Sequence, residues 1–435
     1  MTNVTDEPAV DEEAKRERDG PILLLLGTLY AAQGLPMGLA FIALPAIFRT
    51  LGYSPEAIGL LAFVALPWAV KFVWAPFVDR TGGRRLGRRR SWIIPAQALT
   101  AAVYFLVAAT FDQARDGIWP IVVGLTVINL IGATQDIATD GLAVETLRGR
   151  ALVWANGLQI GAFSVGMMIG GSLTVILFES AGWSGSFTLL GLFVLASLAV
   201  TLLVSETPRP ARDSADTRVE QPSIRNLLRR PGAMLMLSIA ALFHFAHAMT
   251  GAMIGPFLVD AGMSLVDIGL LNGLSLTVIP VCGAAIGSLL AARFGAPRVA
   301  VLLGTLGVVA LLLWVIPARS MHTTFGTALA ISCAVGIGSF GAYVAFFTIL
   351  MQWSSVRQAG TDFTVLQCAE TIVGMMAAAV AGQIAGKFGF LALFIVTPVI
   401  GIMAMAWIFG ALRRLRSICN PAELLPERRV EQVHS

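Results

Sequence analysis

Charged residues are scarce in this sequence. Asp, Glu, Lys and Arg make up 13% of the 435 residues, about half the share that soluble globular domains usually carry. Hydrophobic residues make up 56%, and the mean hydropathy is +0.78. The composition therefore excludes an ordinary soluble domain and indicates a chain that crosses a membrane repeatedly.

Cysteine is also scarce, and its spacing excludes two common roles. The four cysteines are scattered, and they have neither the spacing of metal ligands nor that of a disulfide framework. We therefore expect no metal and no cofactor. The net charge of +4 comes from arginines concentrated in loops. It is a guide to membrane topology and does not indicate a nucleic-acid partner.

Motifs of membrane enzymes and pumps are missing as well. The chain has no GxxxxGK[ST] loop for phosphates, so ATP is not its direct energy source. It has no HExxH metal motif and no GxSxG nucleophile motif. Asp136 and Asp140 lie close together, but an intramembrane aspartyl protease needs its two aspartates on different helices. We therefore expect that the protein is not an enzyme.

Apolar segments long enough to cross a bilayer, about 20 residues, recur along the whole chain. They predict twelve transmembrane helices and an all-α membrane protein. The predicted helices cover residues 21–48, 54–78, 91–111, 118–143, 152–179, 184–204, 232–259, 264–291, 297–317, 324–352, 361–386 and 389–411.

Arginines in the loops set the predicted orientation. Six lie between residues 80 and 90, and because one arginine at the centre of a bilayer costs about 3 kcal/mol, this stretch must be a loop. Loops after even-numbered helices are rich in arginine and opposite loops are poor, which places both termini in the cytoplasm. The first twenty residues are polar and acidic, unlike a signal peptide, so we expect the first helix to be retained. The cytoplasmic tails would be 1–20 and 412–435.

The segment 206–231 is the only long polar interruption. It is expected to be a cytoplasmic linker between six helices over 21–205 and six over 232–411. The pattern SxxxIGLL occurs at Ser54–Leu61 and again at Ser264–Leu271, which indicates an internal duplication. Two six-helix bundles around a central cavity are the architecture of the major facilitator superfamily.

Three charged residues are predicted to lie inside the membrane. Lys71 and Asp136 each lie seven residues before the end of their helix, and Asp140 follows one turn later on the same face as Asp136. Two such close carboxylates require either a bound proton or a compensating cation, for which Lys71 is the candidate. The group is therefore either a proton-responsive coupling site or gate, or a structural ion pair between helices 2 and 4.

The second half holds further ionisable residues. His244 and His247 lie three apart, either as partners in proton exchange or as buried core histidines. Glu370, near Gln367, lies deep in the eleventh helix and is a candidate functional acid. Asp362 lies at the start of that helix, where the helix dipole favours a carboxylate. Amides that either line a substrate cavity or link helices are Gln33, Asn129, Gln135, Asn156 and Gln159.

Five short motifs carry a resemblance to a known family. They are QGLPxG from Gln33, KFxWAPxxDR from Lys71, GRRRSW from Gly87, ATQDIATDG from Ala133 and GTDFT from Gly360. Together they resemble the AmpG-like branch of the major facilitator superfamily. That branch includes the AmpG muropeptide permeases, the acetyl-coenzyme A transporters and the RhtX/FptX siderophore importers. All but GTDFT lie in the first four helices, so the first half carries most of the resemblance.

The resemblance implies a latch formed by the loop between helices 2 and 3. Asp79 would lock against the start of helix 11 when the carrier is open outward. The residues of this latch would be Asp79, Arg80, Arg88, Arg89, Arg90 and Asp362.

The compact twelve-helix form with the GTDFT motif is most similar to the RhtX/FptX importers. The resemblance thus implies a monomeric, proton-driven symporter that imports a ferric siderophore across the bacterial inner membrane by alternating access. The alternatives are an AmpG-type muropeptide permease or another small-molecule carrier and, from a different class, a non-transporting membrane sensor or scaffold. The expected partners are the substrate, protons and the lipid bilayer.

Overall fold

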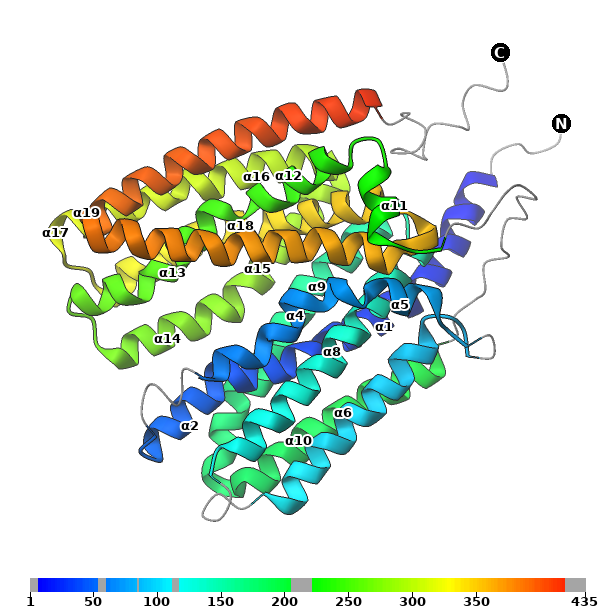
Figure 1. Ribbon diagram of the computed structural model, residues 1–435, viewed down its shortest axis with the longest axis horizontal. Helices are drawn as coiled ribbons and strands as arrows, with labels where there is room; N and C mark the ends of the chain where they lie inside the picture. Colours follow the sequence, from blue (N-terminus) through cyan, green and yellow to red (C-terminus); the bar gives the residue numbers. More distant parts are fainter. Residues whose placement is uncertain (1–6, 54–59, 84–85, 112–116, 205–220, 419–435) are drawn as a thin grey trace.

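The computed structural model describes residues 7–53, 60–83, 86–111, 117–204 and 221–418. Within these ranges every regular element is a helix, including short 3-10 and π segments. Figure 1 shows two groups of helices, one blue to teal and one green to red. They meet near α5 (Ala75–Arg80) and α11 (Ile224–Arg229), and they lie apart at α2 (Leu44–Thr50) and α14 (Leu265–Leu276).

The first group is built from the first part of the chain. Its remaining elements are α1 (Glu7–Gly38), η1 (Leu39–Ala43), η2 (Leu60–Ala65), α4 (Leu66–Val70), η3 (Lys71–Val73), α6 (Arg90–Thr110), α8 (Trp119–Thr146), α9 (Gly149–Met168), η4 (Ile169–Leu173) and α10 (Thr174–Leu203). Because α1 begins at Glu7, helix extends into the segment expected to be a polar tail.

The second group follows α11. Its remaining elements are α12 (Ala233–Phe243), α13 (Phe245–Asp260), α15 (Val278–Phe294), α16 (Ala296–Ala310), η5 (Leu311–Trp314), α17 (Val315–Ser320), α18 (Phe325–Trp353), η6 (Val356–Gln358) and α19 (Ala359–Ile418).

Nine helical stretches of the described chain are long and apolar enough to cross a membrane. Two of them contain two helices each, because the chain turns at Gly182 (φ 60°) inside α10 and at Gly389 (φ 81°) inside α19, a conformation that favours glycine. A shorter apolar stretch, Phe63–Val73, lies where the second helix was predicted. The described ranges therefore contain counterparts of the other predicted helices and part of the second one, and the prediction of an all-α membrane fold is confirmed.

Helix 2, predicted as one helix over 54–78, is divided into short pieces. Its α-helical turns stop at Val70, η3 follows, and helix resumes at Ala75. Pro76 accounts for the break, because proline has no N–H for the carbonyl of Phe72 and its ring crowds the preceding turn. Residues 54–59, and with them most of the first copy of the SxxxIGLL pattern, lie outside the described ranges.

Glycines allow close packing of the helices within each group. Gly34 of α1 and Gly166 of α9 face each other so closely that a Cβ on either would overlap backbone atoms of the other helix. In the second group, a Cβ on Gly287 of α15 would likewise overlap the backbone of Gly341 in α18. These glycines therefore allow close helix contact, as small residues commonly do in membrane proteins.

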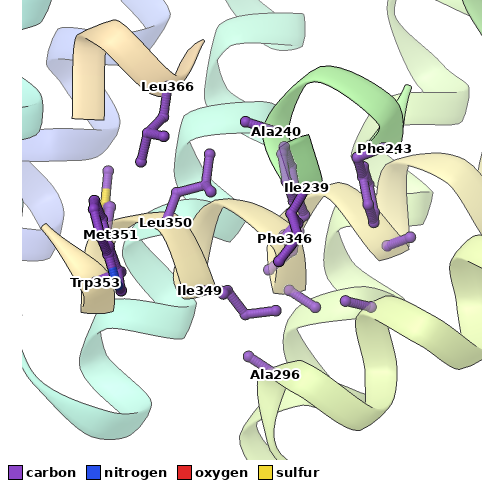
Figure 2. Close-up of a cluster of buried hydrophobic side chains, with 14 of the residues drawn as sticks. Ile239, Ala240, Phe243, Ala296, Phe346, Ile349, Leu350, Met351, Trp353 and Leu366 are labelled. Carbon is purple, nitrogen blue, oxygen red and sulfur yellow. The ribbon is translucent and has the colours of Figure 1, made fainter. Parts of the chain in front are cut away.

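The hydrophobic core is shared between the groups at one end only. One cluster of buried side chains joins Leu26 and Leu152 of the first group to Phe243, Phe346 and other residues of the second. Figure 2 shows part of this cluster, in which the rings of Phe243 and Phe346 stack with centroids 4.0 Å apart. Toward the opposite end each group has a core of its own, around Phe48 and around Phe257.

Candidate functional site

Lys71 lies at the break in helix 2 and pairs with Asp136 of α8. Each residue is only 3% exposed. The Lys71 Nζ also donates to Oε1 of Gln367 on α19, at 2.8 Å, and lies 5.2 Å from the ring centroid of Trp68. Lys71 therefore connects its own group of helices to the other group within the membrane-spanning region.

Asp140, one turn beyond Asp136, has neutral partners. Its Oδ1 accepts from the Tyr30 hydroxyl of α1 at 2.9 Å and from Nε2 of Gln159 on α9 at 3.2 Å. Its Oδ2 is buried without a hydrogen-bond partner in the described chain. Lys71 thus contacts one of the two carboxylates directly, and if both were ionised, one negative charge would stay uncompensated at high desolvation cost.

The predicted acid and histidines of the second half form another cluster. Tyr343 of α18 donates to Oε1 of Glu370 at 2.5 Å, and the His244 ring packs edge-on to Tyr343 with centroids 5.0 Å apart. His247 stacks beside His244 at 5.7 Å. His244 sits between α12 and α13, where its dihedral angles interrupt helix 7. Because Glu370 lies one turn from Gln367, α19 carries one residue of each cluster.

The predicted amides are distributed over several environments. Asn129 accepts from Nε1 of Trp68 at 2.9 Å, whereas Asn156 donates to the carbonyl of Leu152 in its own helix. Gln135 is buried in α8. Gln33 is also buried, and neither end of its amide has a hydrogen-bond partner in the described residues. Gln33 is therefore an amide enclosed in the first group of helices with its hydrogen-bonding capacity unused in the described chain.

Asp79 joins the groups of helices at the end of α5. Its Oδ2 accepts from the backbone N–H of Thr361 in the first turn of α19 at 2.6 Å, and its Oδ1 lies 2.6 Å from the guanidinium of Arg89. Arg89 is fully buried and also pairs with Glu145 at 2.5 Å. Burial alone would lower the pKa of Arg89, but the negative charges of Glu145 and Asp79 raise it by more than burial lowers it. The pKa of Arg89 therefore lies above its ordinary value. Arg88 pairs with the same Glu145.

The remaining predicted latch residues divide between this contact and other roles. Asp362 accepts from Arg230 at 2.6 Å and from the N–H of Ser355 at 2.8 Å. Arg80 donates from Nε to the carbonyl of Pro222 at 2.8 Å. Arg90 lies apart from the contact between the groups, because it donates to the carbonyl of Thr201 in α10.

Several residues that complete these contacts were not among the predicted site residues. They are Tyr30, Trp68, Glu145, Arg230, Tyr343 and Gln367. The composition gives one indication of the tyrosines, since the chain has only four of them and two donate to carboxylates within the apolar helices. A hydroxyl inside an apolar segment needs a partner, and a carboxylate is a strong acceptor.

Comparison with known proteins gives the following likenesses. A family model described as acetyl-coenzyme A transporter 1 matches residues 22–188. The anhydromuropeptide permease of Escherichia coli (strain K12) is 26% identical over 382 residues, which are 85% of this chain and 74% of that protein. The putative transporter AmpG 3 of Rickettsia prowazekii (strain Madrid E) is 25% identical over 296 residues, 63% of this chain and 67% of that protein. The solved structure of FucP, a major facilitator superfamily transporter in the outward conformation, matches with a TM-score of 0.65 at 16% identity, covering 90% of this chain and 98% of that one.

Proposed function

We propose that this multi-pass membrane protein, which has the fold of the major facilitator superfamily, is a permease of the AmpG type that carries a muropeptide across the bacterial inner membrane. Support for this substrate class comes from the likeness to the anhydromuropeptide permease over 85% of the chain. The five motifs resemble the AmpG-like branch as a whole and do not select among its substrates.

The observation that carries a transport mechanism is the bond between Lys71 and Gln367. A buried lysine that pairs with Asp136 in one group of helices and donates to the other group is costly to keep in a membrane. Such a contact has a use in a carrier, because its two sides separate whenever the groups of helices rock against each other.

We infer that a proton drives this movement. Protonation of Asp136 removes its attraction for Lys71, and the released ammonium group changes its contact with Gln367. Asp140 provides a second carboxylate one turn away, so a proton and Lys71 together balance both acids. The cluster of Tyr343, Glu370 and His244 is a second candidate for proton exchange.

Alternating access further requires that the Asp79 contact open and close. In the described arrangement Asp79 and Thr361 join the groups at the end where the hydrophobic core is shared. If that end faces the cytoplasm, as the arginine distribution predicts, the arrangement is the outward-open state. Import would then end with the loss of the Asp79–Thr361 bond.

The siderophore substrate implied by the RhtX/FptX resemblance has less support. The relatives named above are described as a muropeptide permease and an AmpG transporter. The match of a family model described as an acetyl-coenzyme A transporter extends over the first half, where most of the shared motifs lie. We therefore place the muropeptide before the siderophore.

Uptake in right-side-out membrane vesicles tests the proposal. With an inward proton gradient, we expect labelled anhydromuropeptide to accumulate, and a protonophore should abolish the accumulation. Labelled ferric siderophores and acetyl-coenzyme A are assayed in the same vesicles, with empty-vector vesicles as the control. If one of these compounds accumulates and the muropeptide does not, that compound is the substrate and the proposal is wrong. If the protonophore does not change uptake, a proton does not drive transport.

A further inference from the structure

A basic pocket lies between the end of the linker and the start of helix 11. It is a cavity of about 340 Å³ between α11 and η6, and its walls hold three arginines. The lining residues are Asn226, Arg229, Arg230, Ser355, Arg357 and Gln358. The transport mechanism above makes no use of this pocket.

The charges of the pocket are unbalanced. Arg230 pairs with Asp362, which neutralises one guanidinium. The guanidinium groups of Arg229 and Arg357 are exposed, and neither has a hydrogen bond or ion pair to the part of the chain that the structure describes. Two positive charges with fixed, planar donors therefore face the same small space, an arrangement that suits the oxygens of a phosphate group.

The surroundings of the pocket are those of a membrane surface. Leu228, next to Arg229, and Val356, next to Arg357, are both 46% exposed. Apolar side chains beside exposed arginines are typical of the level at which helices leave the hydrocarbon and meet lipid headgroups. A phosphate at this level is available from anionic phospholipids.

The pocket also borders the contact that holds the two groups of helices together. On the linker side, the N–H of Ser223 donates to Oε1 of Gln358 at 3.1 Å, and Arg230 donates to the carbonyl of Trp353. On the other side, Thr361 follows Gln358 by three residues and donates to Asp79. Any ligand that bridges Arg229 and Arg357 would hold α11 against the start of α19 and so support the Asp79 contact.

We propose that this pocket binds a phosphate group, that of an anionic phospholipid headgroup or of a soluble phosphate, and that the bound phosphate stabilises the state in which the Asp79 contact is closed. The proposal concerns the balance between conformations and rests on alternating access alone. It does not depend on which substrate is carried.

Spin-label distances in lipid nanodiscs test it without any substrate. Labels are placed on Leu86→Cys and Gln352→Cys, exposed positions in the two groups of helices, in a background whose native cysteines are serine. Replacing about a third of the phosphatidylcholine by phosphatidylglycerol should raise the ratio of the closed to the open population by about 5-fold or more. Arg229→Gln/Arg357→Gln should abolish this rise. Arg225→Gln, which removes the same charge from an exposed position of α11 outside the pocket, should leave it intact.

A second arm separates the two sources of phosphate. Inorganic phosphate is added to the same protein in pure phosphatidylcholine. If inorganic phosphate raises the ratio of closed to open populations and the double variant abolishes this rise, a soluble phosphate is sufficient. If phosphatidylglycerol raises the ratio and inorganic phosphate does not, the ligand is the lipid headgroup. The proposal is overturned if the double variant responds to phosphatidylglycerol as the wild type does, if Arg225→Gln abolishes the response equally, or if neither form of phosphate changes the populations.

Discussion

At the scale of single residues, the first group of helices places one lysine against two carboxylates. Lys71 contacts Asp136, and Asp140 is held by Tyr30 and Gln159. Because Lys71 can balance one negative charge, the protonation of either acid is linked to the presence of the lysine.

Replacing the lysine should therefore make transport depend more strongly on pH. Lys71→Met leaves two buried carboxylates without a cation, and they are tolerated only when protonated. We expect uptake to fall by about tenfold or more near neutral pH and by less at acidic pH. Uptake in vesicles between about pH 5.5 and 8 measures this. Lys71→Met/Asp136→Asn, which removes both charges, should recover membrane insertion, and parallel pH profiles for wild type and Lys71→Met would contradict the link.

The hydroxyl of Tyr30 should stabilise the folded protein through its hydrogen bond to Asp140. Tyr30→Phe removes a donor from Asp140 and should lower the free energy of unfolding by about 1–2 kcal/mol. Tyr104→Phe is the matched control, because the Tyr104 hydroxyl is buried without a hydrogen-bond partner in the described residues. Unfolding by denaturant in detergent micelles compares the two variants. Equal losses would mean that the bond from Tyr30 to Asp140 contributes no stability.

At the scale of elements, the broken second helix positions the lysine. The 3-10 turn η3 begins at Lys71, and the helix resumes only after Trp74. The indole N–H of Trp68 donates to Asn129 and that of Trp74 donates to Thr134, so both sides of the break are hydrogen-bonded to α8. The break is thus a supported feature of the fold.

Removing the proline that causes this break should impair transport. Pro76→Ala supplies an N–H for the Phe72 carbonyl, favours a continuous helix and turns Lys71 away from Gln367. We expect uptake to fall by about tenfold while the protein still inserts in the membrane. Pro95→Ala is the control, because α6 runs without interruption through Pro95. Normal uptake by Pro76→Ala would show that the break does not position Lys71.

The helices could be predicted because a membrane span is a local property of the sequence. About 20 apolar residues suffice, and every predicted span except the divided second one matches a long apolar helix of the described chain. The breaks at Lys71, His244 and Thr277 could not be predicted in this way, since a hydropathy window does not register a change of dihedral angle. The bond from Lys71 to Gln367 joins residues 296 positions apart and depends on how the two groups of helices dock.

At the scale of the whole molecule, the Asp79 contact joins the groups of helices at the end where they share a hydrophobic core. Asp79 accepts from the backbone N–H of Thr361 in α19, and the residue before Thr361 is Gly360. A Cβ on Gly360 would lie 2.7 Å from the carbonyl oxygen of Ile137 and 2.9 Å from Oδ1 of Asp79. The closed contact therefore requires glycine at this position.

Enlarging this glycine should open the contact. Gly360→Ala must push α19 away from Asp79, and Asp79→Asn, which loses the charge that Arg89 pairs with, should act in the same direction. We expect each to shift the spin-label distances between Leu86→Cys and Gln352→Cys toward the open population and to impair uptake without loss of insertion. Gly386→Ala, on the same helix with no atom within 4 Å of its Cβ, should change neither measurement. A Gly360→Ala protein with wild-type distances would contradict the requirement for glycine.

The hydrogen bonds that Asp79 and Lys71 make between the groups of helices place different requirements on the partner sequence. Asp79 binds the backbone N–H of residue 361, which every residue but proline provides, so a chimera that joins the first six helices of this chain to the last six of a relative retains this bond wherever the relative keeps glycine at position 360. Lys71 binds the side chain of Gln367, so the same chimera retains that bond only if the relative supplies an acceptor there. During divergence, position 361 is thus free to drift beside a fixed glycine at position 360, while position 367 must change in step with position 71.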